Sequence, residues 1–205
     1  MILYQQINLK IPVDLELQLG QLDWEKLPVA SVSKKTDWIQ MAYKKKILFE
    51  LFRYYGWRCQ LIGTLLSSKI PIELENQVRA EISQQLNDQL AIDSIIRLQV
   101  IYGGEMIPIH TDISRKSSIV YPILHPFFSA TAFYKSNSVI ERGMIPPSLC
   151  TPVDSVSIDN YPVILDVSAP HAIVYGKNTY TKKTPRVSLS IKFKKIDFQT
   201  IRRLV

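Results

Sequence analysis

The sequence predicts a mainly β fold with flanking helices, and two patterns carry that prediction. After about residue 91, segments rich in β-branched and aromatic residues recur between glycine and proline turn signals. Short strands at that spacing are typical of an all-β sandwich or barrel rather than of βαβ units. Before that point the apolar residues follow a helical spacing instead. We therefore expect N-terminal helices to buttress a C-terminal β core.

Two helical segments are expected in the first part of the chain. Residues 38–55 are dense in apolar and aromatic side chains, several of them near helical spacing. The segment 71–90 is the stronger candidate, because it has proline at its expected first turn and acidic residues directly after it. Its apolar residues recur every fourth position, at Leu74, Val78, Ile82 and Leu86. This stripe predicts a helix that packs against a sheet.

Seven strands are expected in the second part of the chain, each bounded by turn signals. They span Ser94–Tyr102, Met106–Asp112, Ser117–Leu124, Ala130–Tyr134, Val163–Val167, His171–Tyr175 and Val187–Phe193. We expect one domain over residues 1–205, because no internal repeat or low-complexity linker divides a chain of this length. Within it, residues 1–93 form a mixed helical support, residues 94–195 form the β core and residues 196–205 form a tail.

The composition fits a folded protein with a sizeable core. Hydrophobic residues make up 46% of the 205 residues, which excludes a disordered chain. No segment approaches the roughly 20 apolar residues that span a bilayer, and the first residues do not resemble a signal peptide. The two cysteines, Cys59 and Cys150, form no CxxC pair, which excludes a zinc ribbon and a dithiol redox motif. We expect a soluble, cytoplasmic protein with reduced thiols.

The chain carries a positive charge whose role the sequence leaves open. It has 25 Lys and Arg residues against 18 Asp and Glu residues, which gives a formal net charge of +7. The lysines form short clusters at Lys34–Lys35, Lys44–Lys46, Lys182–Lys183 and Lys194–Lys195. Such clusters are typical of solvated faces, but they also fit a nucleic-acid surface or the attraction of an anionic small substrate.

Histidine is scarce, and its positions are informative. Only His110, His125 and His171 occur, so any site that uses histidine must draw on these three. His110 and Asp112 lie two residues apart at the end of an expected strand, where residues i and i+2 point to the same face. His171 begins another expected strand. Two histidines and one carboxylate are the ligand set that binds non-haem Fe(II) and leaves the opposite coordination positions open.

A second pair of residues fits an organic anion. Arg186 and Ser188 lie two residues apart on the last expected strand and therefore share one face. A guanidinium can bind a carboxylate through two parallel hydrogen bonds, and a hydroxyl beside it can donate a third. His125 fits neither pattern, and we interpret it as a residue at the end of a strand.

The order HxD, distal histidine and RxS on an all-β core resembles the Fe(II)/2-oxoglutarate-dependent oxygenases. Their fold is a double-stranded β-helix, also described as a jelly roll or cupin-like fold. The resemblance covers roughly residues 95–195. The segment 98–104 is similar to the one that leads into HxD in the prolyl-hydroxylase-like and phage-type small members, and residues 115–123 are similar to their following strand.

The resemblance implies a metal centre and a reaction. His110, Asp112 and His171 would ligate Fe(II), with 2-oxoglutarate as co-substrate and O2 as oxidant. The implied activity is hydroxylation of an unactivated C–H bond, with release of succinate and CO2. Related halogenases have a small residue in place of the carboxylate, so Asp112 favours hydroxylation or demethylation through a hydroxymethyl intermediate.

The resemblance also implies how the co-substrate is held. Arg186 would pair with the C5 carboxylate of 2-oxoglutarate, and Ser188 would donate a hydrogen bond to the same group. Family members often add a tyrosine hydroxyl, for which Tyr102 and Tyr121 are the candidates. We expect the polar segment 135–161 to cover the mouth of the barrel and to contact the substrate.

Several functions stay open at this point. The leading interpretation is a hydroxylase of a small molecule or of an amino-acid side chain, free or in a peptide. The positive charge keeps a nucleic-acid-directed oxygenase or demethylase as an alternative. A non-catalytic cupin-like binding protein, or a cupin-type metalloprotein without a 2-oxo acid, are the remaining ones, and Arg186 argues against the last of these.

Overall fold

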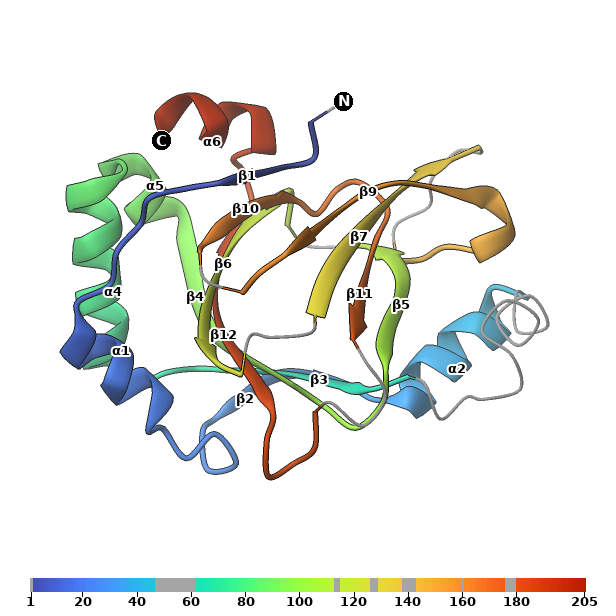
Figure 1. The fold of residues 1–205 in the computed structure, drawn as a ribbon, viewed down its shortest axis with the longest axis horizontal. Coiled ribbons are helices and arrows are strands. Elements are labelled where there is room, and N and C mark those ends of the chain that lie inside the picture. The colour runs from blue at the N-terminus through green and yellow to red at the C-terminus, as the bar shows by residue number, and fades with distance from the viewer. Residues whose placement is uncertain are drawn as a thin grey trace.

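Two antiparallel sheets that face each other form the centre of the molecule, and helices cover the outer side of the larger sheet (Figure 1). The structure is a computed structural model, and it describes residues 2–46, 62–112, 115–125, 129–137, 143–159, 161–175 and 180–205. No helix in this described part is long and apolar enough to cross a membrane. Cys59 lies outside the described residues, and Cys150 is a free thiol.

The larger sheet has seven strands in the order β1-β10-β6-β12-β4-β3-β2. Their bounds are Tyr4–Gln6 (β1), Val163–Asp166 (β10), Ser117–Leu124 (β6), Arg186–Phe193 (β12), Ser94–Tyr102 (β4), Thr64–Ser68 (β3) and Val29–Ser33 (β2). The central strand β12 pairs with β4 along its whole length and with β6 on its other side. The N-terminal part of the chain therefore contributes three strands to this sheet as well as helices.

The smaller sheet has five strands in the order β8-β5-β11-β7-β9. Their bounds are Gly143–Met144 (β8), Met106–Thr111 (β5), His171–Tyr175 (β11), Ser129–Ser136 (β7) and Cys150–Ser157 (β9). Strand β11 lies between β5 and β7 and pairs antiparallel with both.

Successive strands alternate between the two sheets from β4 to β7 and again from β9 to β12. A chain that winds back and forth in this way forms a jelly roll, or double-stranded β-helix, of the cupin-like kind. This strand order confirms the expected fold class. Apolar side chains fill part of the space between the sheets, among them Val120, Phe133, Val163 and Leu165.

Helices α1 (Val13–Gly20), α4 (Ile72–Gln85), α5 (Asp88–Asp93) and α6 (Phe198–Leu204) lie on the outer side of the larger sheet, whereas α2 (Lys35–Lys44) lies beside β8. A 3-10 turn spans Pro147–Leu149. Each of the four outer helices buries apolar residues in the same cluster as the sheet, including Leu15, Val78, Leu90 and Phe198. Burial of each such side chain contributes about 1.5–3 kcal/mol.

The residues of β12 alternate between two environments. One face carries Val187, Leu189, Ile191 and Phe193, which are at most 2% exposed and belong to the helix-side core. The other face carries Arg186, Ser188, Ser190 and Lys192 and points between the sheets. The period of two in the sequence thus gives one strand an apolar face toward the helices and a polar face toward the interior.

The expected helix over residues 71–90 is two helices. Helix α4 ends at Gln85, and α5 begins at Asp88 after a short break. Asn87 explains the break, because its side chain accepts a hydrogen bond from the backbone N–H of Gln89 at 2.8 Å and so caps the second helix. The expected helical segment 38–55 begins within α2, and its residues from 47 onward lie outside the described residues.

The segment 135–161 is largely ordered as regular structure rather than as a loop. It contains β8, the 3-10 turn and the eight-residue strand β9, whereas residues 138–142 and 160 lie outside the described part. Strand β9 is at the edge of the smaller sheet, and most of its residues are exposed. A strand with so few buried positions needs no apolar alternation, which explains why its sequence resembles a loop. The expected tail over residues 196–205 likewise contains helix α6.

Candidate active site

Three side chains that could bind a metal ion meet at one end of the smaller sheet. His110 lies near the end of β5, Asp112 directly follows that strand, and His171 begins β11. The two strands pair with His171 opposite His110, so residues about sixty positions apart become neighbours. One ligand atom from each of the three side chains lies within 4.8 Å of the others. The structure therefore brings together the residues that the sequence singled out as metal ligands.

A β-bulge shapes this end of β5. Between His171 and Ile173 the register advances two residues on β11 but three on β5. Pro108 lies in the longer stretch, and proline is tolerated there because a bulge leaves one residue out of the ladder. The carbonyl oxygen of Pro108 accepts a hydrogen bond from Nδ1 of His110 at 2.7 Å. The bulge thus helps to aim the imidazole of His110.

Both histidines present the same nitrogen to the centre of the trio. Nδ1 of His171 donates to the carbonyl oxygen of Ala169 at 3.0 Å, as Nδ1 of His110 does to its own carbonyl partner. Because a carbonyl only accepts, each Nδ1 carries the hydrogen and each Nε2 keeps a lone pair. This is the arrangement that orients a metal-binding histidine.

Burial keeps both imidazoles neutral. It lowers the pKa of His110 by more than the nearby carboxylate of Asp112 raises it. Burial, together with the neighbouring His110, lowers the pKa of His171 to about 4. Both rings are therefore uncharged at neutral pH, which is the form that binds a metal ion.

Asp112 is held from two sides. Its backbone N–H donates to the carbonyl oxygen of Val167 at 3.0 Å, and its Oδ2 accepts a hydrogen bond from Nε of Arg115. Its Oδ1 stays on the side of His110, at 3.9 Å from Nε2. Burial alone would raise the pKa of Asp112, but the overall shift is downward, and the charge of Arg115 is its largest cause. The carboxylate is therefore ionised at neutral pH.

Arg115 is a positioning residue that sequence reasoning missed. Besides its ion pair with Asp112, it donates from Nη1 to Oγ of Ser190 on β12 at 3.2 Å. It therefore links the carboxylate of the trio to the facing sheet. The only local signal for it is its spacing of three residues from Asp112, and the contact with Ser190 depends on the tertiary fold.

The predicted carboxylate receptor lies on the facing sheet. Arg186 and Ser188 share the inner face of β12 and are 3% and 1% exposed. Within the described part of the chain, Nε of Arg186 and Oγ of Ser188 have no hydrogen-bond partner. The carboxylate of Asp159 acts on the charge of Arg186, but the two form no ion pair. A buried guanidinium without a hydrogen-bonded carboxylate is costly, so this arrangement fits a site that receives an anion.

Tyr102 and Tyr121 are not brought to Arg186. Both pack against the helix-side core of the larger sheet. The centroid of the Tyr102 ring lies 5.5 Å from that of Trp24. The hydroxyl of Tyr121 donates a hydrogen bond to Oε2 of Glu16 at 3.2 Å.

Two other tyrosines, Tyr180 and Tyr175, act on the charge of Arg186, and Tyr175 is the one with an unpartnered hydroxyl among the described residues. It is 4% exposed, its hydroxyl has no hydrogen-bond partner within the described part of the chain, and its pKa responds to the charge of Arg186. Burial raises the pKa of Tyr175, which keeps the phenol protonated and able to donate. Gly63 leaves room for it, because a Cβ there would lie 1.8 Å from the hydroxyl. The sequence signal that could have identified Tyr175 is its spacing of four residues from His171, which places both side chains on the same face of β11.

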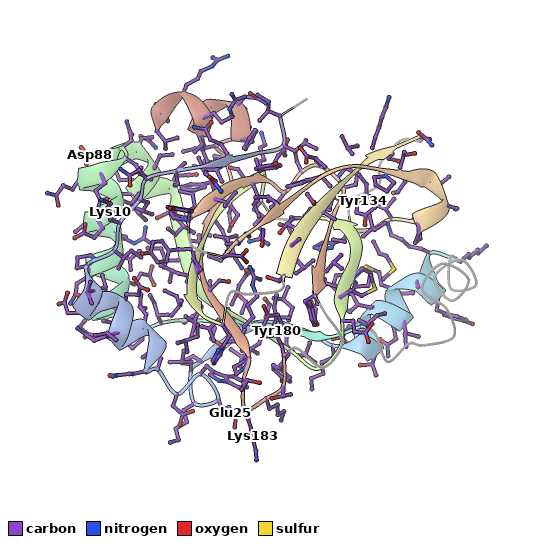
Figure 2. The ribbon with its side chains drawn as sticks, in the orientation of Figure 1. Lys10, Glu25, Asp88, Tyr134, Tyr180 and Lys183 are labelled. Carbon is purple, nitrogen blue, oxygen red and sulfur yellow. The ribbon has the colours of Figure 1, made fainter. Side chains whose placement is uncertain are left out.

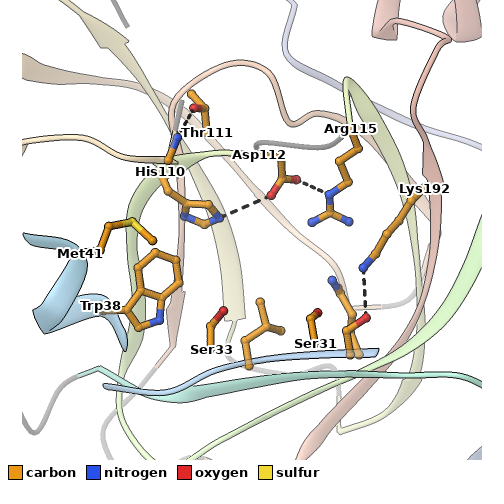
Figure 3. Close-up of a pocket in the computed structure, with 13 residues that line it drawn as sticks. Ser31, Ser33, Trp38, Met41, His110, Thr111, Asp112, Arg115 and Lys192 are labelled. Atoms are coloured by element: carbon orange, nitrogen blue, oxygen red, sulfur yellow. Dashed lines mark hydrogen bonds and ion pairs between the residues drawn. The ribbon is translucent and has the colours of Figure 1, made fainter. Parts of the chain in front are cut away.

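Two cavities adjoin the trio. The outer cavity has a volume of about 300 Å³, and its wall includes Trp38, Ser67, Gln99, His110, Asp112 and Lys192 (Figure 3). The inner cavity has a volume of about 30 Å³, and its wall includes Gln99, His110, His171 and Arg186. Gln99 and His110 border both cavities, so the trio lies between an outer chamber and the buried arginine.

The remaining histidine takes no part in the site. His125 follows the last residue of β6, is exposed and has a positive φ of 49°. The structure thus places it at the end of a strand, as expected.

No protein-family model and no curated protein sequence matches the chain. Among solved structures, the non-heme alpha ketoglutarate dependent epimerase SnoN from nogalamycin biosynthesis is 10% identical, with a TM-score of 0.41, over 90% of this chain and 82% of that one. The Escherichia coli ribosomal oxygenase YcfD is 9% identical, with a TM-score of 0.36, over 68% and 34%. The hydroquinone 1,2-dioxygenase PnpCD is 12% identical, with a TM-score of 0.34, over 50% and 59%.

The chain spans only about a third to three fifths of the length of the first solved structures that it resembles. L-ribose isomerases are among the similar structures as well as oxygenases. The assignment of the fold therefore rests on the strand order, and the chemistry must come from the site itself.

Proposed function

We propose that this protein is a non-haem Fe(II)- and 2-oxoglutarate-dependent oxygenase that hydroxylates a C–H bond of a small molecule. One observation carries the proposal. A trio of metal-binding type shares, through its two histidines, an inner cavity with a buried arginine whose Nε has no hydrogen-bond partner within the described residues. A metal site alone fits many cupin-like proteins, but the guanidinium of Arg186, which Asp159 influences without forming an ion pair, can also bind an organic anion.

The donor set fits Fe(II). His110, Asp112 and His171 would supply two neutral nitrogens and one carboxylate oxygen, which is the facial set of non-haem iron oxygenases and leaves open positions. Their orientation is fixed before any ion arrives, by two backbone carbonyls and by Arg115. Bound there, the iron would supply the activation of O2 and the oxidation of the substrate.

The unpartnered polar atoms fit 2-oxoglutarate. Arg186, Ser188 and Tyr175 offer a guanidinium, a hydroxyl and a protonated phenol, all buried. They would hold the distal carboxylate of the co-substrate, because charge-assisted hydrogen bonds are strongest where water is excluded. His110 and His171 border the same inner cavity as Arg186. The cavity would have to widen when the co-substrate enters.

The two lysine clusters beside β12 do not form a nucleic-acid surface around the trio. The Lys182–Lys183 cluster precedes β12 and Lys194–Lys195 follows it, so the two lie at opposite ends of an eight-residue strand. Such a strand is about 26 Å long. Lys183 points outward, away from the body of the molecule (Figure 2). These two clusters therefore do not converge on the trio as a nucleic-acid surface around the site would require. The clusters Lys34–Lys35 and Lys44–Lys46 lie at the two ends of α2, which borders the outer cavity, so they keep the nucleic-acid alternative open.

An anaerobic titration tests the proposal. Fe(II) and 2-oxoglutarate added to the protein without O2 should produce the weak visible charge-transfer band of an iron-bound 2-oxo acid. We expect His110→Ala to abolish the band, because it removes a ligand. Arg186→Met should keep Fe(II) binding and weaken 2-oxoglutarate binding about 100-fold, since a charged hydrogen-bond pair is lost.

The exposed Arg203→Met is the matched control, because it removes the same charge far from the trio, and it should titrate like the wild type. Absence of the band in the wild type would sink the assignment. A band with unchanged 2-oxoglutarate affinity in Arg186→Met would leave an iron protein but remove Arg186 from its site.

A further inference from the structure

The outer cavity has a surplus of positive charge. Its wall holds two cations, Arg115 and Lys192, and one carboxylate, Asp112. That carboxylate forms an ion pair with Arg115 and also acts on the charge of Lys192, so one acidic group serves two basic ones among the described residues of the wall. A bound metal ion in the trio would increase the surplus.

Lys192 points into the cavity from the end of β12. Its Nζ donates to Oγ of Ser67 on β3 at 3.1 Å, which stretches the side chain across the intervening strand β4. A hydroxyl does not neutralise an ammonium group. Burial lowers the pKa of Lys192 to about 7, and the charge of nearby Arg115 adds to that effect. An anion placed beside this amine would offset both costs.

The floor of the cavity is a row of hydrogen-bonding side chains. Ser31 on β2 pairs in register with Ser67 on β3, and Ser67 pairs with Gln99 on β4. All three border the outer cavity, because opposite residues of neighbouring strands point to the same face. Gln99 is in turn opposite Ser188, so the row leads toward the inner cavity.

The opposite wall is apolar. Trp38 and Met41 of α2 border the cavity on the side away from Lys192 (Figure 3). The centroid of the Trp38 ring lies 5.3 Å from the centroid of the His110 ring. A molecule that spans the cavity therefore meets an ammonium group and hydroxyls at one end and an indole beside the trio at the other.

We propose that the outer cavity binds the primary substrate as a small carboxylate. Its carboxylate would pair with Lys192 and accept from the serine row, and its apolar remainder would lie along Trp38 and Met41, next to His110. A volume of about 300 Å³ is at the lower end for small-molecule sites and admits no folded partner. This inference rests on the proposed function, because it assigns that site its substrate class.

Matched probes separate charge from shape. Hexanoate and its neutral isostere hexanamide would be titrated by calorimetry into protein loaded with Zn(II) and 2-oxoglutarate, which cannot turn over. We expect hexanoate to bind about tenfold tighter than hexanamide, because a buried charged pair is worth more than a neutral hydrogen bond. Lys192→Met should remove this preference, and Lys192→Arg should keep most of it.

Lys194→Met is the matched control, because it removes the same charge from an exposed position two residues away, and it should leave the preference unchanged. Equal binding of the two probes, no binding of either, or an unchanged preference in Lys192→Met would overturn the inference. So would displacement of hexanoate by 2-oxoglutarate, which would mean that the co-substrate itself occupies the outer cavity.

The two proposals can fail separately. If 2-oxoglutarate does not bind but hexanoate shows its Lys192-dependent preference with Zn(II) alone, the proposed function fails and the anion site stands. If the iron and 2-oxoglutarate titration succeeds and the hexanoate preference is absent, the oxygenase assignment stands and the substrate class is wrong.

Discussion

The two faces of β12 are almost equally buried but opposite in chemistry. Toward the helices the strand presents four apolar side chains, Val187, Leu189, Ile191 and Phe193. Toward the smaller sheet it presents four polar ones, Arg186, Ser188, Ser190 and Lys192. The apolar face holds the helices to the sheet, and the polar face lines both cavities. The comparison teaches that burial alone does not identify a core residue, because half of this strand is largely buried without belonging to an apolar cluster.

The largest expected difference between the two faces is in stability. Phe193→Ala removes a fully buried ring from the helix-side core and should lower the free energy of unfolding by about 3–5 kcal/mol. Arg186→Met on the other face should change it little or raise it, because it removes a buried charge that has no ion-pair contact within the described residues. Urea denaturation of the metal-free proteins measures both. A loss of similar size in Arg186→Met would mean that the arginine serves the fold.

A pH titration of stability sharpens the comparison at Lys192. The unfolded lysine keeps its proton up to a pKa of about 10.5, whereas the folded one loses it near 7. Between these values the unfolded state binds more protons, so the stability of the metal-free wild type should rise with pH relative to Lys192→Met. The slope is at most about 1.4 kcal/mol per pH unit. Chemical denaturation at pH 7, 8 and 9 tests this.

The groups that set this pKa besides burial are Arg115, Asp112 and Arg97. No difference in slope between wild type and Lys192→Met would mean that the amine stays charged in the folded protein. Lys194→Met again serves as the comparison, and its slope should match that of the wild type.

The smallest expected effect compares two buried hydroxyls on opposite faces of the larger sheet. Ser188 and Ser68 are both buried and lack a hydrogen-bond partner among the described residues. Ser188 shares the inner face with Arg186, whereas Ser68 pairs with Leu98 of the helix-side core. Ser188→Ala should weaken 2-oxoglutarate binding up to about tenfold, and Ser68→Ala should not change it. Equal effects would remove Ser188 from the co-substrate site.

The sequence is a good guide to this site where a single strand carries the information. His110 and Asp112 are two residues apart, as are Arg186 and Ser188, and each pair shares a face without any knowledge of the fold. The all-β core could be predicted too, because its strands are separated by clear turn signals, whereas the jelly-roll path was implied by the family resemblance. Strand β12 shows this best, since its polar and apolar residues alternate without a break.

The tyrosines show what strand periodicity alone cannot predict, namely which side chain approaches Arg186. Tyr102 shares the apolar face of β4 with Leu98 and Val100, whereas Gln99 lies on the other face. The period of two separates these faces but does not say which of them meets the smaller sheet. Tyr121 lies on β6 beside a proline, and only its contact with Glu16 reveals its direction. Tyr175 could be related to His171 by spacing, but its approach to Arg186 depends on how the two sheets face each other.

The roles of Arg115 and Lys192 could not be predicted from local sequence patterns either, because their contacts depend on the tertiary fold. The contact of Arg115 with Ser190 joins residues 75 positions apart, and that of Lys192 with Ser67 joins residues 125 apart. Neither separation leaves a periodic trace in the sequence. The sequence alone therefore could not predict the outer cavity, because residues of β2, β3, α2 and the end of β12 contribute to its wall.

The pairing of His110 with His171 makes any bound cation a removable cross-link. It would tie together two strands that lie about sixty residues apart along the chain, and only in the native arrangement. Because an ion that binds the folded state alone stabilises it by mass action, each tenfold rise in free metal above the dissociation constant adds about 1.4 kcal/mol. The melting temperature of this protein would then rise with the concentration of free metal. Metal depletion would lower the free energy of unfolding as well as the proposed activity.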